Sequence, residues 1–162
     1  MNFDKAYAQF MEKHIEESSG LRKEKLLKDL GPGEKLFLKD GWWEVFGNFD
    51  YLYPEFMVRD YQDGYRFLDL AYLRPPFWLN FEIDGFRTHQ SRIDRAKFSD
   101  DRDRQNMLVL DDWKVFRFSY DMLRDQKRAC QAQLLQIIGR LYGDPSKYFL
   151  SPQERIIMQH AG

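Results

Sequence analysis

The chain has 162 residues and a mass of 19.6 kDa, which is the size of one ordinary domain. Lys and Arg number 25 and Asp and Glu number 26, so the net charge of −1 excludes a protein that binds nucleic acid or membranes through bulk charge. Apolar residues make up 43% of the chain, which excludes intrinsic disorder, and the single cysteine excludes an internal disulfide.

Targeting signals are not recognisable in the sequence. The first ten residues lack the basic start and the apolar run of a secretion signal. No stretch reaches the roughly twenty apolar residues that a membrane-spanning helix needs. The sequence therefore predicts a soluble, cytoplasmic protein without membrane contact. No repeat or linker divides it, which predicts one domain over residues 1–162.

The first third of the chain predicts three helices. Apolar residues recur every three or four positions over residues 3–15, which indicates an amphipathic helix. A heavily charged helix is predicted over residues 21–30, and it completes an N-terminal helical extension over residues 1–30. A Gly-Pro-Gly sequence then breaks the pattern, and a third helix is predicted from Glu34 towards Trp42.

Three consecutive antiparallel strands are predicted next. Residues 56–60, 65–73 and 77–84 are rich in aromatic and branched side chains, which favour strands. Turn-forming residues at 62–64 and 74–76 separate them. Short connections of this kind join neighbouring antiparallel strands.

The second half of the chain predicts a helix, a strand and a long closing helix. Charges return with helical spacing over residues 91–112. The run at 113–118 is apolar on both faces, which is typical of a buried central strand. A helix over residues 121–142 is predicted to be capped by Ser119 or Asp121.

The order of these elements predicts an α/β protein with a mixed central sheet flanked by helices. The sheet and its helices form a core over residues 33–142, which follows the N-terminal extension. A C-terminal tail over residues 145–162 is predicted to hold one more short helix, which a Ser-Pro pair at 151–152 begins.

The hairpin between the second and third strands brings acidic residues together. If residues 74–77 form a four-residue turn, counting back along both strands places Asp69 opposite Glu82. Asp84 and Asn80 share the face of Glu82. Carboxylates about 5 Å apart repel one another, and oxygen ligands of this kind favour Mg²⁺ or Mn²⁺ over zinc. The alternative is a set of solvated acids on the open face of an antiparallel sheet.

Cationic residues follow this acidic patch in the sequence. His89 lies five residues after Asp84 in a short polar loop, from which its imidazole could reach the acids. The basic residues beyond Asp84 are Arg87, Arg92, Arg95, Lys97, Arg102 and Arg104. Carboxylates, a histidine and guanidinium groups together are what metal-assisted phosphodiester hydrolysis requires. The alternative for the basic stretch is a solvated helix held by ion pairs.

Four segments of the sequence resemble one family. They are Phe-Leu-Asp at 67–69, Phe-Glu-Ile-Asp-Gly at 81–85 with His89, Asp-Arg-Asp-Arg at 101–104 with Leu108, and Asp-Trp-Lys-Val-Phe-Arg-Phe at 112–118. Together they resemble the endonuclease-like domains related to very-short-patch-repair enzymes, in the PD-(D/E)XK or restriction-endonuclease-like superfamily. The resemblance runs from about Gly33 to Leu141 and implies an αβββαβ core.

The resemblance implies a role for each residue of the acidic patch. Asp69 and Glu82 would bind the metal together with the backbone carbonyl of Ile83, and Glu34 would complete the site. His89 would position or deprotonate the attacking water, or protonate the leaving oxygen.

The arginines would carry the positive charge of the site. Arg104 would contact phosphate or hold the acids. Asp84 departs from the pattern because it stands where the superfamily has a lysine, so Arg87, Arg104 or Arg117 is left to stabilise charge. The residues that would bind nucleic acid are Arg87, Arg92, Arg95, Arg102, Arg104 and Arg117.

We therefore expect a Mg²⁺-dependent DNA endonuclease or nickase, in which a cation on Asp69 and Glu82 polarises a phosphodiester and lowers the pKa of a bound water. An alternative is a catalytically degenerate module that binds DNA or a protein in a repair, defence or mobile-element assembly; the replacement of the lysine by Asp84 favours it. A third hypothesis is an RNA or branched-DNA nuclease. Cutting both strands often involves a homodimer, to which the surface at Trp42 and Trp43 or the N-terminal helix could contribute.

Large apolar side chains elsewhere are expected in the core. Most of the tryptophans, Trp42, Trp43, Trp78 and Trp113, are expected to be core residues, although exposed ones could stack on bases. Cys130 has no histidine near it in the sequence and is expected to be a small buried apolar residue.

Overall fold

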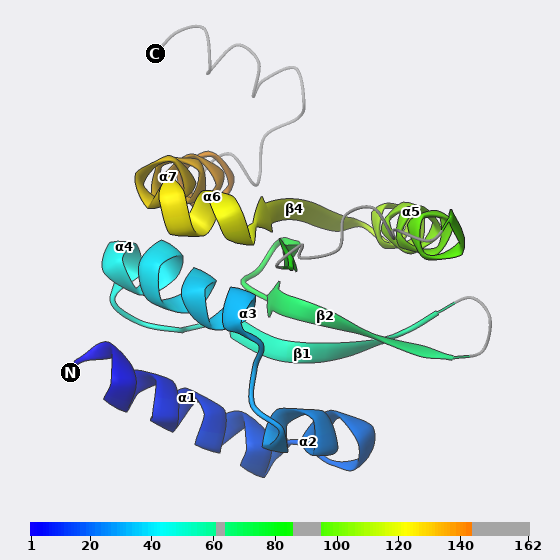
Figure 1. The fold of residues 1–162 in the computed structure, drawn as a ribbon, viewed down its shortest axis with the longest axis horizontal. Coiled ribbons are helices and arrows are strands. Elements are labelled where there is room, and N and C mark those ends of the chain that lie inside the picture. Colours follow the sequence, from blue (N-terminus) through cyan, green and yellow to red (C-terminus); the bar gives the residue numbers. More distant parts are fainter. Residues whose placement is uncertain (61–63, 86–94, 144–162) are drawn as a thin grey trace, which may run out of the picture.

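A computed structural model describes residues 1–60, 64–85 and 95–143. Its centre is a four-stranded sheet in the order β1-β2-β3-β4, and helices cover both faces (Figure 1). The predicted α/β class, with a mixed sheet flanked by helices, is confirmed. The helix predicted after residue 151 lies outside the described residues. Within the described part of the chain, no helix has the length and apolarity needed to cross a membrane.

The first third of the chain is helical, as predicted. Its helices are α1 (Phe3–Glu17), α2 (Gly20–Leu27), α3 (Pro32–Leu36), the π-helical segment η1 (Phe37–Trp43) and α4 (Glu44–Phe46). α1 begins after Asn2, whose side-chain oxygen accepts a hydrogen bond of 2.9 Å from the Lys5 N–H. α3, η1 and α4 form one continuous helical stretch, which ends at Gly47, where φ is +67°.

The sheet consists of β1 (Leu52–Arg59), β2 (Tyr65–Tyr72), β3 (Trp78–Asp84) and β4 (Trp113–Ser119). The first three strands are antiparallel neighbours, and β4 is parallel to β3. β1 begins at Leu52 rather than at Phe56, so it contains Pro54. A proline is tolerated there because β1 is an edge strand of the sheet.

The prediction of a central strand at 113–118 is wrong, because β4 is the other edge of the described sheet. Trp113 and Phe118 are buried, but Lys114 and Arg117 are exposed. The helix α5 (Arg95–Leu110) lies between β3 and β4 in the sequence, and a helical crossover of this kind joins parallel strands. An edge strand leaves part of its side chains in contact with solvent, and Arg117 is one of them.

The core consists of two clusters on opposite faces of the sheet. The larger cluster packs α1, α2, η1 and α7 (Lys127–Tyr142) against the strands, and the ring of Phe37 lies 5.4 Å from that of Phe81 and 5.5 Å from that of Phe118. The smaller cluster contains Leu68, Ala71, Leu108 of α5 and Trp113. The two clusters hold the sheet between helices, so residues of β2 and β3 are fixed from both sides.

The backbone is irregular at Glu55, and the alternation of side chains between the two faces of the sheet shifts at this point. Glu55 has a φ of +50°, in the left-handed region, and the ladder between β1 and β2 is interrupted there. Leu70 packs in the larger cluster and Leu68 in the smaller one, although residues two apart normally share a face. The two leucines therefore lie on opposite faces of the sheet, and Asp69 lies at the point where the face changes.

The closing helix is divided in two. α6 (Tyr120–Asp125) begins after Ser119, whose Oγ accepts a hydrogen bond of 3.1 Å from the Met122 N–H, as the predicted cap requires. Gln126, with φ −137° and ψ 48°, leaves the helical region and separates α6 from α7. The single helix predicted over residues 121–142 is therefore two helices.

The expected core residues are mostly buried. Cys130 is fully buried, and Trp42 and Trp113 are nearly so. Trp78 is an exception, because 54% of it is exposed, although its ring lies 5.5 Å from that of Trp113.

Candidate active site

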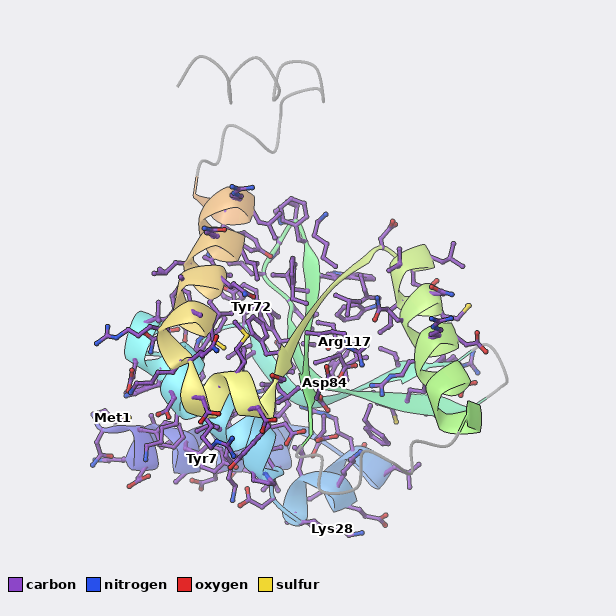
Figure 2. The ribbon with its side chains drawn as sticks, turned by 45° about the horizontal axis from the view of Figure 1, so that its top comes forward. Met1, Tyr7, Lys28, Tyr72, Asp84 and Arg117 are labelled. Atoms are coloured by element: carbon purple, nitrogen blue, oxygen red, sulfur yellow. The ribbon has the colours of Figure 1, made fainter. Side chains whose placement is uncertain are left out.

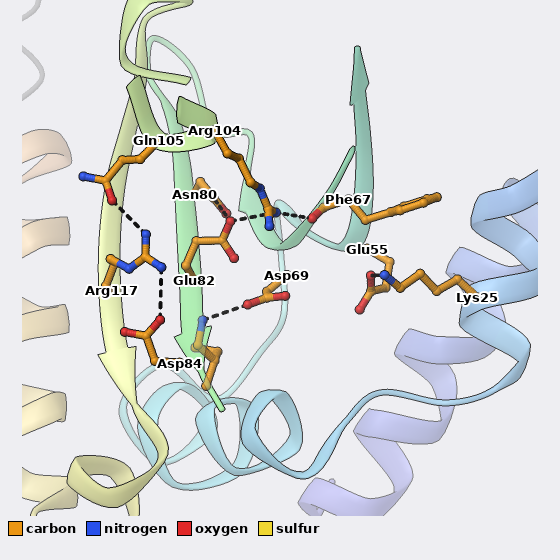
Figure 3. Close-up of polar contacts among 11 residues, drawn as sticks. Lys25, Glu55, Phe67, Asp69, Asn80, Glu82, Asp84, Arg104, Gln105 and Arg117 are labelled. Carbon is orange, nitrogen blue, oxygen red and sulfur yellow. Dashed lines mark hydrogen bonds and ion pairs between the residues drawn. The ribbon is translucent and has the colours of Figure 1, made fainter. Parts of the chain in front are cut away.

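The hairpin between β2 and β3 has the predicted register. The Phe77 N–H donates to the Arg74 carbonyl over 3.2 Å, and Leu70 pairs with Phe81. Continuing the ladder by one pair places Asp69 opposite Glu82. The Ile83 N–H donates to Asp69 Oδ2 over 2.8 Å, which turns the Asp69 carboxylate towards β3 (Figure 3).

The Glu82 carboxylate is buried and held by two side chains. Its Oε1 accepts a hydrogen bond from Asn80 Nδ2 over 2.9 Å and pairs with Arg104 Nη2 over 2.9 Å. Arg104, from α5, also donates to the Phe67 carbonyl on β2. Glu82 is 6% exposed, so this carboxylate is fixed in orientation within the protein.

Asp69 cannot ionise easily beside Glu82. Burial raises the pKa of Asp69 far above its ordinary value, and the charge of Glu82 and a hydrogen bond with Glu82 raise it further. The Ile83 N–H opposes this shift, but it is weaker than the other three causes. In the absence of a cation, Asp69 therefore keeps its proton at neutral pH.

The proton held by Asp69 predicts how Asp69→Asn changes stability. The folded state binds the proton more tightly than the unfolded chain, in which the pKa of an aspartate is about 4, so cation-free stability falls as pH rises from about 4. Asparagine can accept the Ile83 hydrogen bond and donate to Glu82 without titrating. We expect Asp69→Asn to raise the free energy of unfolding by about 1–3 kcal/mol at pH 7.5 and by little at pH 4.

Urea unfolding of both proteins in EDTA at several pH values measures this difference. Equal pH profiles for the two proteins would show that Asp69 is already ionised in the folded state.

Asp84 lies on the same face of β3 but has a different partner. Its Oδ1 pairs with Arg117 Nη2 over 3.1 Å, and Arg117 Nη1 also donates to Gln105 Oε1 over 2.7 Å. Figure 2 shows Asp84 and Arg117 beside each other, next to β4. Of the three acids expected in one patch, the structure therefore brings Asp69 and Glu82 together and holds Asp84 in a separate ion pair.

Glu34 does not join the acidic pair by direct contact. Its carboxylate folds back over Gly31, where a Cβ atom would lie 2.6 Å from Oε2. Its charge is close enough to contribute a small further rise to the pKa of Asp69. Glu34 therefore affects Asp69 through its charge. The contacts described for Glu34 include no hydrogen bond to Asp69 or Glu82.

Several predicted site residues lie outside the part of the chain that the structure describes. These are His89, Arg87 and Arg92, together with the side chain of Arg95. Arg102 is exposed on α5. Of the predicted arginines, Arg104 and Arg117 face the acids.

A pocket of about 200 Å³ opens at the acidic pair. Residues of β2, β3, α5 and β4 line it: Asp69, Glu82, Ile83, Asp84, Gly85, Arg104, Gln105, Leu108, Val115 and Arg117. Two buried polar atoms beside Glu82, Asn80 Oδ1 and Arg104 Nε, have no hydrogen-bond partner among the described residues.

The donor set fits a hard divalent cation. No group of three or more Asp, Glu, His or Cys side chains in the described ranges is arranged to hold a metal. Mg²⁺, however, is usually bound by one or two carboxylates, with water and substrate phosphate completing its shell. Asp69 of β2 and Glu82 of β3 supply two carboxylates. The backbone carbonyl of Ile83, the residue after Glu82, is a further oxygen.

Sequence reasoning missed three residues of this region. Gln105 orients Arg117, and no local pattern marks it on α5. Asn80 was expected on the face of Glu82, but its hydrogen bond to that carboxylate was not. Glu55 is 7% exposed and pairs with Lys25 Nζ over 3.2 Å; burial raises its pKa. Glu55 lies just before the strand predicted at 56–60, so no signal marked it as part of β1.

Comparison of the chain with models of protein families, with curated proteins and with solved structures gave no match.

Proposed function

We propose that the chain is a metal-dependent phosphodiester hydrolase that cuts or nicks DNA. The observation that carries the proposal is the pair of carboxylates formed by the half-buried Asp69 and the buried Glu82, in the wall of a pocket that also contains Arg104 and Arg117. Two adjacent acids that are largely withdrawn from solvent destabilise a protein in the absence of a cation, so such a pair points to a functional site.

The residues of the pocket would hold Mg²⁺ or Mn²⁺ between the two carboxylates. Asp69 is oriented by the Ile83 N–H, and Glu82 is oriented by Asn80 and Arg104, so both are held in place before a cation arrives. When bound, the cation supplies a Lewis acid that polarises a phosphodiester and lowers the pKa of water.

The pocket suits a phosphate of an extended polymer. Its volume of about 200 Å³ is smaller than the roughly 300–1,000 Å³ of pockets that enclose small molecules. A backbone phosphate can enter such a pocket while the rest of the polymer stays on the surface. The two guanidinium groups of the pocket can compensate the negative charge of the acids and of that phosphate together.

The order of elements supports DNA as the substrate. From α3 to α7 the order is helix, three strands, helix, strand, helix, which contains the αβββαβ order that the resemblance to PD-(D/E)XK domains implies. A restriction-endonuclease-like identity is part of the proposal. A cytoplasmic location and a homodimer for cutting both strands belong to it as well.

Cleavage of plasmid and oligonucleotide DNA tests the proposal directly. We expect nicked or linear products with Mg²⁺ or Mn²⁺ and none with EDTA. A folded protein that cuts neither plasmid nor oligonucleotide DNA with either cation contradicts the proposal.

One observation favours a second candidate, a catalytically inactive module that binds DNA or a protein. Glu82 is already paired with Arg104, so one of the two acids is partly compensated without a cation. The candidates differ in cation binding, which calorimetric titration with Mn²⁺ measures. We expect one Mn²⁺ per chain in wild type and none in Asp69→Ala; the absence of binding in wild type would favour the inactive module.

A further inference from the structure

Arg117 reaches the pocket through the parallel pairing of β3 and β4. In this ladder Glu82 is the partner of Arg117, and side chains of paired residues project from the same face. Arg117 therefore stands beside the acidic pair, on a strand that is fixed along its length. Its side chain is 39% exposed, so it lies between the buried acids and the surface.

Two side chains from different elements hold the Arg117 guanidinium. Asp84 of β3 contacts Nη2 over 3.1 Å, and Gln105 of α5 contacts Nη1 over 2.7 Å (Figure 3). A guanidinium is a planar group with five N–H donors, so contacts at both Nη atoms fix its plane. A fixed plane is useful for binding a phosphate, which guanidinium groups bind through two parallel hydrogen bonds.

Arg104 is placed for a different role. Its Nη2 contacts Glu82 and the Phe67 carbonyl, and its side chain is 24% exposed. A guanidinium that holds a buried carboxylate and a backbone carbonyl is part of the wall of the pocket. The two arginines thus differ: one compensates the acids, and the other faces the solvent side of the pocket.

We propose that Arg117 is the ligand for the substrate phosphate, and that Asp84 and Gln105 are its positioning residues rather than ligands of the cation. This inference rests on the proposed function, because it takes a nucleic-acid phosphate as the group that enters the pocket. It gives Asp84 a role that needs no direct contact with the cation or the substrate.

Binding of a short fluorescein-labelled DNA duplex, followed by anisotropy in EDTA so that nothing is cut, tests the role of Arg117. We expect Arg117→Gln to weaken binding by roughly tenfold. The slope of log K against log salt should fall in magnitude by about 0.9, the value for one phosphate contact. Arg117→Lys should keep the slope and recover part of the affinity, because it keeps the charge without the planar fork.

Gln105→Ala tests positioning without changing the charge. We expect it to weaken binding in the wild-type background, to leave the salt slope unchanged, and to have no effect in the Arg117→Gln background. A purely structural role for Gln105 would weaken binding equally in both backgrounds, which overturns the assignment of positioning.

Arg124→Gln is the matched control. Arg124 also donates to a neighbouring carboxylate, Asp125, over 2.8 Å, and it is 49% exposed, but it lies on α6 and does not line the pocket. We expect the DNA affinity and the salt slope of the Arg124→Gln variant to equal those of wild type. Equal losses in Arg117→Gln and Arg124→Gln overturn the inference while the proposed function stands. A wild-type protein that neither binds nor cuts DNA overturns both.

Discussion

Glu82→Gln is expected to lower cation-dependent DNA cleavage by roughly a thousandfold, which corresponds to about 4 kcal/mol of transition-state stabilisation. Glutamine has nearly the same shape, and its carbonyl oxygen can still accept hydrogen bonds from Asn80 and Arg104. The variant therefore removes a negative charge from the pair with Asp69 and changes little else. Cleavage rates at saturating Mg²⁺, with Mn²⁺ affinity from calorimetry, measure the effect.

Glu44→Gln is the matched control for this variant. Glu44 also pairs with a cation, Lys127, over 2.9 Å, and accepts a hydrogen bond from an amide, Gln131, over 2.7 Å, but it lies outside the pocket. We expect Glu44→Gln to cut DNA at the wild-type rate. If Glu82→Gln also cuts at that rate, the acidic pair does not hold a catalytic cation.

Arg104→Met is expected to destabilise the cation-free protein by about 3 kcal/mol, because removing one partner of a buried ion pair leaves the other charge uncompensated. Glu82 is 6% exposed and would keep only neutral partners among its described contacts, Asn80 and the protonated Asp69. Methionine retains most of the apolar stem of arginine, so the loss is mainly electrostatic. Denaturant unfolding in EDTA measures the difference.

The expected loss depends on the charge of Glu82. In the Glu82→Gln background, Arg104→Met should cost much less, because no carboxylate is then left unpaired. Addition of Mn²⁺ should raise the melting temperature of Arg104→Met more than that of wild type, since the cation replaces the lost guanidinium. Equal costs of Arg104→Met in both backgrounds would show that Arg104 stabilises the fold only through packing.

The acidic pair was predictable because it depends on a short turn. A strand has a side-chain period of two, so one correct turn length sets every pair along the hairpin. The turn at 74–77 was identified from its two prolines, and the observed pairing of Leu70 with Phe81 is the one it requires. The position of Asp69 opposite Glu82 then followed from counting residues back along both strands.

The partners of these acids were not predictable in the same way. Arg104 and Gln105 lie on α5, and Arg117 lies on β4, which is joined to β3 through that helix. Their contacts with Glu82 and Asp84 depend on how a helix docks on the sheet, for which no counting rule exists. The position of β4 at the edge was also missed, because an apolar run such as 113–118 does not show how many neighbouring strands a strand has.

The net charge of −1 is set by composition, whereas the pairing of the charges is set by the tertiary structure. The sequence by itself determined that the charges are nearly equal, that acids cluster on one hairpin and that arginines follow them, because composition and strand periodicity are local properties. Only the tertiary structure decided which charges meet. It pairs Arg104 with Glu82 and Arg117 with Asp84 across elements distant in the sequence, and it raises the pKa of Asp69, because burial and neighbouring charge depend on the packed chain.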